Sequence, residues 1–105
     1  MYNRHTEFEF DAEKERRNVK THGINFETAK EVFFDPEAVA LEDIKHSGME
    51  KRWHAIGRIS DGRVITVWFT YREERIRLIG AAEFRKGRKI YEENKRTRFF
   101  KNETS

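Results

Sequence analysis

The sequence predicts an α+β domain in which two N-terminal helices and one C-terminal helix accompany an antiparallel β-meander. A chain of 105 residues is long enough for one modest core and too short for two. Aromatic residues make up 13% of the chain, which predicts a folded core even though 39% of the residues are charged. The spacing of apolar residues is helical near both ends and alternates in the middle, which is typical of helices flanking a sheet.

The first third of the chain predicts a short strand and two helices. Glu7–Phe10 alternates polar and apolar residues, as a strand does. Asp11 is placed to cap a helix over residues 12–21, and Asn25 is placed to cap a second helix. The second helix ends before Pro36, because the residue preceding a proline disfavours helix. Its apolar residues recur at helical spacing and predict a buried stripe of Phe26, Ala29, Val32 and Phe33.

The rest of the chain predicts four strands and a last helix. The strands are expected over residues 38–41, 53–59, 64–71 and 75–80. Residues 42–51 are polar and predict a loop, while Asp61-Gly62 and Glu73-Glu74 predict two tight hairpin turns. A helix is expected over residues 84–94. The domain is therefore expected to span residues 1–95, followed by a frayed basic tail over residues 96–105.

The two turns predict which side chains share a face of the sheet, because successive strand residues alternate faces. A two-residue turn at Asp61-Gly62 places Trp53 opposite Thr70, and a second one at Glu73-Glu74 places Thr70 opposite Arg77. The face under the helices then holds Ile56, Ile65, Val67, Phe69, Tyr71, Ile76 and Leu78. The open face holds Trp53, Thr66, Trp68, Thr70, Arg75, Arg77 and Ile79. By the same alternation His54 lies on the core side, and neither His54 nor the loop residue His46 is expected to act as a catalyst.

The expected open face has the composition of a surface that binds nucleic acid. Guanidinium groups bind phosphate through two parallel hydrogen bonds, and indole rings stack on bases. Single-stranded RNA or a ribosomal surface is therefore one expected partner. The alternative is a second small core, with the indoles covered by a loop or a partner chain. Residues 72–105 carry 11 basic and 6 acidic side chains, net +5, which favours a phosphate-bearing partner or, alternatively, a solvated charged surface.

Several function classes lack the residues that they need. The chain has no cysteine, which removes disulfides, thiolate catalysis and cysteine-bound zinc. Its four histidines are not at metal-ligand spacing, and no Gly-rich phosphate loop or nucleophile elbow is present. We expect no metal and no cofactor. The N-terminus has no apolar signal-peptide centre and no apolar run is long enough to span a membrane, so a cytoplasmic protein without membrane contact is expected.

The chain resembles the BrnT family of toxins over about residues 7–93. The first part of the resemblance lies in Phe8-Glu9-Phe10-Asp11, Asn18, His22-Gly23-Ile24-Asn25-Phe26-Glu27, Ala29, Val32-Phe33 and Asp35-Pro36. The second part lies in Glu50, Arg52, Ile56-Gly57-Arg58, Gly62, Thr70, Arg72, Arg75-Ile76-Arg77-Leu78-Ile79 and Tyr91-Glu92. Each motif is weak by itself, and their common order and spacing carry the resemblance.

The resemblance implies the toxin half of a type II toxin–antitoxin pair with a fold similar to RelE-type ribonucleases. Members of the family inhibit translation by degrading RNA. The implied partner is a cognate antitoxin of ribbon-helix-helix type, and DNA is contacted only through that antitoxin when the complex represses its operon. A non-catalytic basic module that binds RNA or protein is the alternative, and a DNA-binding domain is a third reading without a recognition-helix motif to support it.

A metal-independent endoribonuclease needs only a base, an acid and cations, because the RNA 2′-hydroxyl is the nucleophile. Lys20 and His22 are candidates for proton transfer, and Arg75 and Arg77 are candidates for a phosphate clamp. The expected RNA contacts are Trp53, Trp68, Thr70 and Arg72. The family commonly ends its last strand with Ser-Ala-Arg, where this chain has Gly80-Ala81-Ala82. The resemblance therefore implies that position 82 is catalytic. Ala82, in place of the family's arginine, is expected to weaken the activity.

Overall fold

The computed structural model of the chain describes the backbone of residues 6–104 and the side chains of residues 6–95. The observed order of helices and strands follows the predicted order. The elements are β1 (Phe8–Glu9), α1 (Ala12–His22), α2 (Phe26–Ala29), η1 (Lys30–Phe34), β2 (Val39–Glu42), η2 (Ile44–His46), β3 (Arg52–Arg58), β4 (Val64–Arg72), β5 (Arg75–Ala82) and α3 (Arg85–Thr104). The predicted second helix is divided into α2 and the 3₁₀ helix η1, and α3 continues through residues expected to form a frayed tail. The side chains of residues 96–105, on which the prediction of a basic tail depends, lie outside the described residues.

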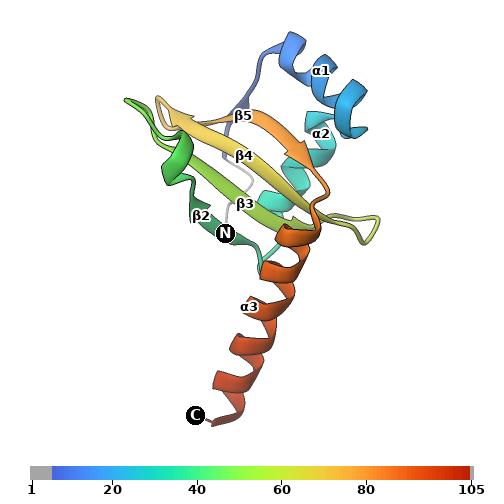
Figure 1. The fold of residues 1–105 in the computed structure, drawn as a ribbon, viewed down its shortest axis with the longest axis vertical. Coiled ribbons are helices and arrows are strands. Elements are labelled where there is room, and N and C mark those ends of the chain that lie inside the picture. Colours follow the sequence, from blue (N-terminus) through green and yellow to red (C-terminus); the bar gives the residue numbers. More distant parts are fainter. Residues whose placement is uncertain (1–5, 105) are drawn as a thin grey trace.

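The sheet has five strands in the order β1-β5-β4-β3-β2, and it is mixed (Figure 1). Strands β2 to β5 pair in antiparallel fashion, as predicted for the meander. Strand β1 pairs in parallel with the outer edge of β5, placing Phe8 beside Ile76. The expectation of a purely antiparallel sheet is therefore wrong. The local sequence pattern of a two-residue strand carries no information about which distant edge it will pair with.

Helices cover both faces of the sheet, whereas the sequence analysis expected one covered face. The main core, under α2 and η1, consists of Ile24, Phe26, Ala29, Val32, Phe33, Ala55, Ile59, Ile65, Val67, Phe69, Ile76, Leu78 and Ala81. A second cluster lies on the other face, where Tyr91 of α3 packs against Ile56 and Val64. Beyond this contact α3 projects away from the sheet (Figure 1). The second face is therefore covered at one end by α3.

The hairpin between β3 and β4 differs by one residue from the predicted turn. Arg58 pairs with Val64, and the Ile59 N–H donates to the Arg63 carbonyl, so residues 60–62 form a three-residue loop. Gly62 has a φ of 95°, and a glycine with positive φ is what this loop type requires at its last position. An Asp-Gly pair suits both loop lengths, so the sequence alone does not choose between them.

This one-residue difference exchanges the two faces of β3 relative to β4. Trp53 pairs with Phe69 and packs against the main core, so the prediction that Trp53 shares an open face with Trp68 is wrong. Ile56 lies on the face of α3, not in the main core. His54 pairs with Trp68 and therefore lies on the face opposite the main core, not on the core side where it was expected.

The hairpin between β4 and β5 confirms the predicted two-residue turn. Arg72 pairs with Arg75, and Thr70 pairs with Arg77. Glu73 and Glu74 both have positive φ values, 52° and 68°, as a type I′ turn requires. Farther along, the register shifts between Trp68 and Phe69, so that Trp68 pairs with Gly80. Ile79 is the extra residue of this bulge and does not continue the regular alternation that the prediction assumed.

A hydrogen-bonded carboxylate fixes α3 to the body of the domain. Asp35 accepts a hydrogen bond from the Tyr91 hydroxyl at 2.6 Å and from the Arg58 N–H at 2.7 Å. Burial by itself raises the pKa of Asp35, but the hydrogen bonds from Arg58, Tyr91 and Glu37 outweigh it and hold the pKa below its usual value. Burial and the neighbouring carboxylate raise the pKa of Tyr91 to about 12.

Tyr91→Phe is expected to lower the free energy of unfolding by about 1–2 kcal/mol at neutral pH, because a hydrogen bond to a charged acceptor is lost. The lowered pKa of Asp35 means that its contribution is present above the pKa of the unfolded carboxyl and is lost as pH falls through the folded value. The difference between the two proteins should therefore narrow in acid. Urea unfolding at pH 7 and at about pH 3 measures it. An equal difference at both pH values would contradict this account of Asp35.

Candidate functional site

A cluster of four rings lies on the face of the sheet that α3 leaves partly open. Trp68 of β4 lies at the centre of the cluster and is half-buried. Its ring centroid lies 6.1 Å from that of His22, at the end of α1, and 6.4 Å from that of His54, on β3. Phe84 stacks on Trp68 at 5.9 Å and also meets His22 at 6.2 Å. We refer to His22, His54, Trp68 and Phe84 as the Trp68 cluster. Four separate segments of the chain contribute to it.

The position of the Trp68 indole depends on the absence of a side chain at Gly80. A Cβ atom at this residue would lie within the van der Waals radius of the indole ring. The bulge at Ile79 brings Gly80 opposite Trp68, so the ring lies against bare backbone. The half-buried indole is therefore held in place on the face that carries the cluster.

Basic side chains continue from the cluster along the sheet. Arg52, Thr70 and Arg77 form the next row across β3, β4 and β5. The Arg77 side chain is 23% exposed and lies 3.8 Å from the Glu9 carboxylate. The Thr70 hydroxyl donates to the Lys51 carbonyl at 2.6 Å, and Thr70 is 1% exposed. Arg77 is thus available at the surface, while the hydroxyl of Thr70 holds the loop before β3.

The other arginines predicted for the site lie farther from Trp68, near the β4–β5 turn. Arg75 pairs with Glu7 at 2.9 Å, and Arg72 pairs with Glu50 at 3.3 Å. Exposed ion pairs of this kind contribute about 0–1 kcal/mol, so a phosphate can replace the carboxylate at little cost. Arg72 and Arg75 are thus held beside carboxylates at the turn end of the sheet.

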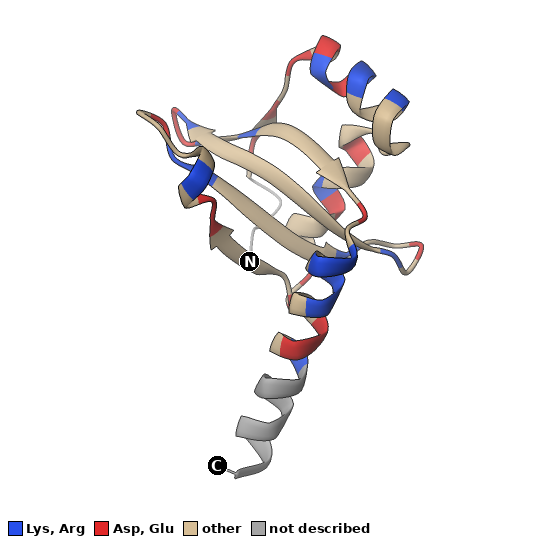
Figure 2. Cartoon of the chain, viewed as in Figure 1, with Lys and Arg blue, Asp and Glu red and all other residues tan. Residues whose placement is uncertain are grey.

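A hollow of about 600 Å³ opens beside the Trp68 cluster, between η2 and the first turn of α3. It is lined by apolar side chains that include Phe84 and Ile90 and by the cations Lys45, Arg85 and Lys86. Basic residues mark both η2 and the start of α3 in Figure 2. The rim also carries the carboxylates of Glu42 and Asp43, which the three cations outnumber, so the hollow suits a ligand that carries both rings and phosphates.

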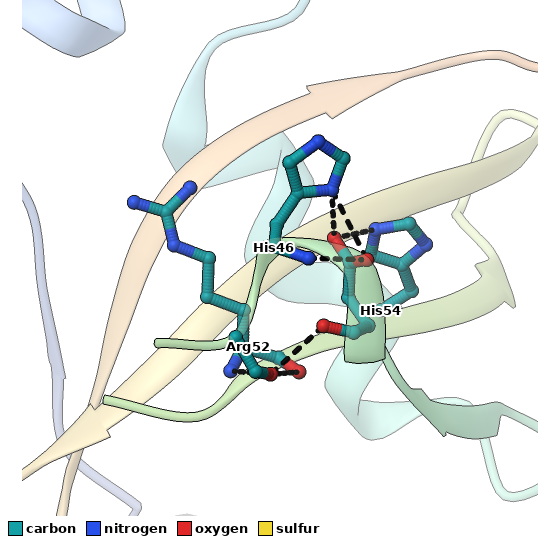
Figure 3. Close-up of polar contacts among 5 residues, drawn as sticks. His46, Arg52 and His54 are labelled. Atoms are coloured by element: carbon teal, nitrogen blue, oxygen red, sulfur yellow. Dashed lines mark hydrogen bonds and ion pairs between the residues drawn. The ribbon is translucent and has the colours of Figure 1, made fainter. Parts of the chain in front are cut away.

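One carboxylate at the edge of this hollow holds two histidines (Figure 3). Asp43 accepts a hydrogen bond from His46 Nδ1 at 2.9 Å and from His54 Nε2 at 3.2 Å. Burial by itself raises the pKa of Asp43, but the hydrogen bonds from His46 and the charges of both histidines lower it overall. Asp43 therefore stays ionised and orients both rings.

The structure brings some of the predicted site residues together and separates others. Trp68 and Arg77 lie on one face of the sheet, as predicted, and the end of α1 brings His22 beside Trp68. Lys20 points away from His22 on α1 and lines a different hollow with Val19 and Glu27. Ala82 ends β5 opposite Thr66 and is 1% exposed, so this alanine presents no group to a ligand.

The sequence analysis missed His54 and Phe84. His54 was assigned to the wrong face by the shifted β3–β4 register. Phe84 follows β5 without any periodic pattern of its own, and only the approach of α3 to β4 brings its ring onto Trp68. The sequence does contain a signal for His54, because a three-residue hairpin loop ending in Gly62 places His54 beside Trp68.

No group of three or more potential ligands is gathered for a metal ion in the described part of the chain. None of the helices within it is both long and apolar enough to cross a bilayer.

Comparisons with known proteins agree on one family. A family model described as the ribonuclease toxin BrnT of type II toxin–antitoxin systems matches residues 10–87. The fold is similar to a 1.1 Å crystal structure of the Brucella abortus ribonuclease toxin BrnT, with a TM-score of 0.59 and 18% sequence identity. That match covers 75% of this chain and 96% of the Brucella chain. No curated protein matches the sequence.

Proposed function

The chain belongs to the BrnT family of ribonuclease toxins of type II toxin–antitoxin systems, and on that premise we propose that it cleaves single-stranded RNA bound across the Trp68 cluster. The proposal depends chiefly on one observation, that a half-buried indole and the partly exposed Arg77 guanidinium lie on the same face of the sheet. A base packs against the exposed part of the stacked Trp68 and Phe84 rings, and the adjoining phosphate reaches Arg77. Lys45, Arg85 and Lys86 rim the neighbouring hollow and extend the positive path.

The cleavage proposed here requires no metal ion, because RNA carries its own nucleophile. The 2′-oxygen attacks the adjacent phosphorus, the bond from phosphorus to the 5′-oxygen breaks, and a 2′,3′-cyclic phosphate forms. His22 lies at the cluster and supplies a proton to the departing 5′-oxygen. Arg77 stabilises the charge on the pentacoordinate phosphorus. Lys20 takes no part in this scheme, because it lines a hollow on another side of α1.

A cognate antitoxin is proposed to neutralise the chain by occupying the same face. An antitoxin segment with acidic side chains fits the cationic rim and covers Trp68 and Phe84, of which Phe84 is 44% exposed. Contact with DNA would then pass through the antitoxin, and a ribbon-helix-helix protein is the expected type. Free of its antitoxin, the chain is proposed to inhibit translation in the cytoplasm by cutting RNA, either free or on the ribosome.

Purified protein without antitoxin should cut single-stranded RNA in the presence of EDTA and leave 2′,3′-cyclic phosphate ends. The assay is run with and without ribosomes, since the two substrates distinguish free RNA from ribosome-bound RNA. Protein that binds RNA tightly and leaves it intact under both conditions would identify a non-catalytic binding module and overturn the proposal.

RNA that carries 2′-O-methyl groups cannot be cut, so it reports binding alone. Trp68→Leu should weaken its binding by about 5- to 150-fold, because one stacked base is lost. Arg77→Ala should reduce the slope of log Kd against log salt by about 0.7, the value for one phosphate contact. Arg63→Ala is the matched control, since Arg63 lies beside the β3–β4 loop and pairs with Asp61. Equal losses for Arg77→Ala and Arg63→Ala would contradict the assigned surface.

A further inference from the structure

His54 contacts both a carboxylate and the proposed RNA surface. Its Nε2 atom lies 3.2 Å from the Asp43 carboxylate, and its ring meets Trp68 at 6.4 Å between centroids. From the sequence alone, His54 was expected to have no catalytic role. We propose that His54 is the general base of the cleavage reaction and that Asp43 is its positioning residue, an inference that rests on the ribonuclease function proposed above.

Asp43 is held firmly enough to orient an imidazole. Its side chain is 13% exposed. Its backbone N–H donates to the Arg52 carbonyl at 2.8 Å, and its own carbonyl accepts from the Ser47 hydroxyl at 2.8 Å. The Ser47 oxygen in turn accepts from the Arg52 N–H at 3.0 Å, which closes the loop onto β3. Hydrogen bonds to both the N–H and the carbonyl of Asp43 therefore fix the backbone that carries this carboxylate, beside the strand that carries His54 (Figure 3).

The contact with Asp43 selects the tautomer of His54 that a base requires. A carboxylate only accepts hydrogen bonds, so Nε2 must carry the proton that lies between the two residues. The Nδ1 atom then has a free lone pair when the ring is neutral. Among the described residues, Nδ1 of His54 has no hydrogen-bond partner. The lone pair is consequently left for a proton from outside the protein.

His54 and His22 reach Trp68 from opposite flanks of β4. His54 comes from β3, which adjoins one edge of β4, and His22 comes from α1, which packs along β5 at the other edge. In-line cleavage needs a base beside the 2′-oxygen and an acid beside the departing 5′-oxygen. In the proposed step, the 2′-hydroxyl proton passes to Nδ1 of His54, the bond to phosphorus forms, and the 5′-oxygen takes a proton from His22 as its own bond breaks.

The charged groups around His54 fit an anionic substrate. His46 shares the Asp43 carboxylate, and Glu42 and Lys45 line the hollow from the β2 and η2 side. Arg85 and Lys86 line it from the start of α3. The three cations attract the phosphates that flank the bond to be cut, while Asp43 counters their repulsion of the imidazolium that forms during the reaction.

The test uses the full chain, freed of antitoxin, with substitutions at His54 and Asp43 and one control variant. His54→Gln keeps a donor for Asp43 and should lower the rate of cleavage by about 10²- to 10⁴-fold, the usual contribution of a general base. His54→Gly should lose activity similarly and regain part of it when imidazole is added to the solution. Asp43→Asn should lower the rate of cleavage while leaving the Kd for 2′-O-methyl RNA unchanged, and Asp43→Glu should restore part of the rate, because a carboxylate again accepts the hydrogen bond from Nε2. Arg63→Ala is the control and should keep the rate within about threefold of the unaltered protein, because Arg63 lies beside the β3–β4 loop and pairs with Asp61, away from His54.

Binding of 2′-O-methyl RNA should be the same for the unaltered protein and His54→Gln, since the proposed role concerns the reaction and not affinity. If the unaltered chain cuts RNA and His54→Gln cuts it equally fast, the inference is overturned while the ribonuclease function stands. Loss of activity in His54→Gly without rescue by imidazole, or an Asp43→Asn protein that cuts RNA at the full rate, would also overturn it. If the unaltered chain leaves all RNA intact, both proposals fail.

Discussion

Replacing Asn18 with leucine is expected to lower the free energy of unfolding by about 3–5 kcal/mol. Asn18 lies on α1 and is 6% exposed. Its amide nitrogen donates to the carbonyls of Ile24 and Ala81, both at 2.9 Å, and its amide oxygen accepts from the Ala81 N–H at 3.0 Å. Each buried backbone group that loses its partner costs about 1–3 kcal/mol, and leucine leaves three of them unpaired.

Asn18 completes an edge of the sheet that β1 leaves open. Strand β1 pairs with β5 at Ile76 and Arg77, and the same edge of β5 continues to Ala81 without a strand beside it. The Asn18 amide supplies there the donor and acceptor that a neighbouring strand would supply. Because this contact also fixes the end of α1, His22 depends on it for its place beside Trp68.

Urea unfolding of Asn18→Leu measures the loss, and Arg17→Ala is the neighbouring control on the exposed side of α1. The Arg17 guanidinium lies 3.7 Å from Glu13 in an exposed ion pair, so its removal should change stability by less than about 0.5 kcal/mol. A loss of less than about 1 kcal/mol for Asn18→Leu would show that water or a shift of α1 satisfies the Ala81 backbone.

The order of helices and strands could be predicted because its signals are local. Asp11 accepts a hydrogen bond from the Glu13 N–H at 2.8 Å and starts α1, and Asn25 accepts from the Thr28 N–H at 2.8 Å and starts α2. Capping depends on residues two or three positions apart, so the pattern is visible in the chain itself. The paired glutamates at positions 73 and 74 also marked their turn correctly.

The faces of β3 could not be predicted because they depend on one residue of loop length. Gly62 supports either a two-residue or a three-residue loop, and only packing of Trp53 against Phe69 distinguishes them. The error moved His54 to the core side and Trp53 to the open side. The shared face of Trp68 and Arg77 was predicted correctly, whereas the pairing of His54 with Trp68 was not foreseen.

The parts of the site that sequence reasoning missed are those that long-range packing assembles. His22 and Trp68 were singled out from residue type and from family resemblance, yet their contact depends on α1 lying along β5. Phe84 joins them only because α3 begins against β4. A cluster built from four segments has no spacing pattern in the chain, and the family resemblance marked one of its four members.

Gly87→Ala is expected to destabilise the domain by about 1–3 kcal/mol, although alanine is the better helix former by about 1 kcal/mol. Gly87 lies in the first turn of α3, where a Cβ atom would fall inside van der Waals contact with the Thr66 hydroxyl of β4. Thr66 is 4% exposed and β-branched, so rotation about its first side-chain bond exchanges the hydroxyl for a methyl group and gives no relief. The helix must then move off the sheet, away from Ile56.

The sign of this effect separates close packing from helix propensity, and a double substitution isolates the cause. In a Thr66→Ala background the hydroxyl is gone, and Gly87→Ala should then be neutral or stabilising by up to about 1 kcal/mol. Lys89→Ala, on the exposed side of the same helix, should change stability by less than about 0.5 kcal/mol. Urea unfolding of the four proteins of the cycle gives the coupling between positions 66 and 87. Because α3 brings Phe84 and Arg85 to the site, Gly87→Ala should also weaken RNA binding, and Thr66→Ala should restore it together with the stability. A stabilising effect of Gly87→Ala alone would mean that α3 has room to spare above β4 and that propensity governs this position.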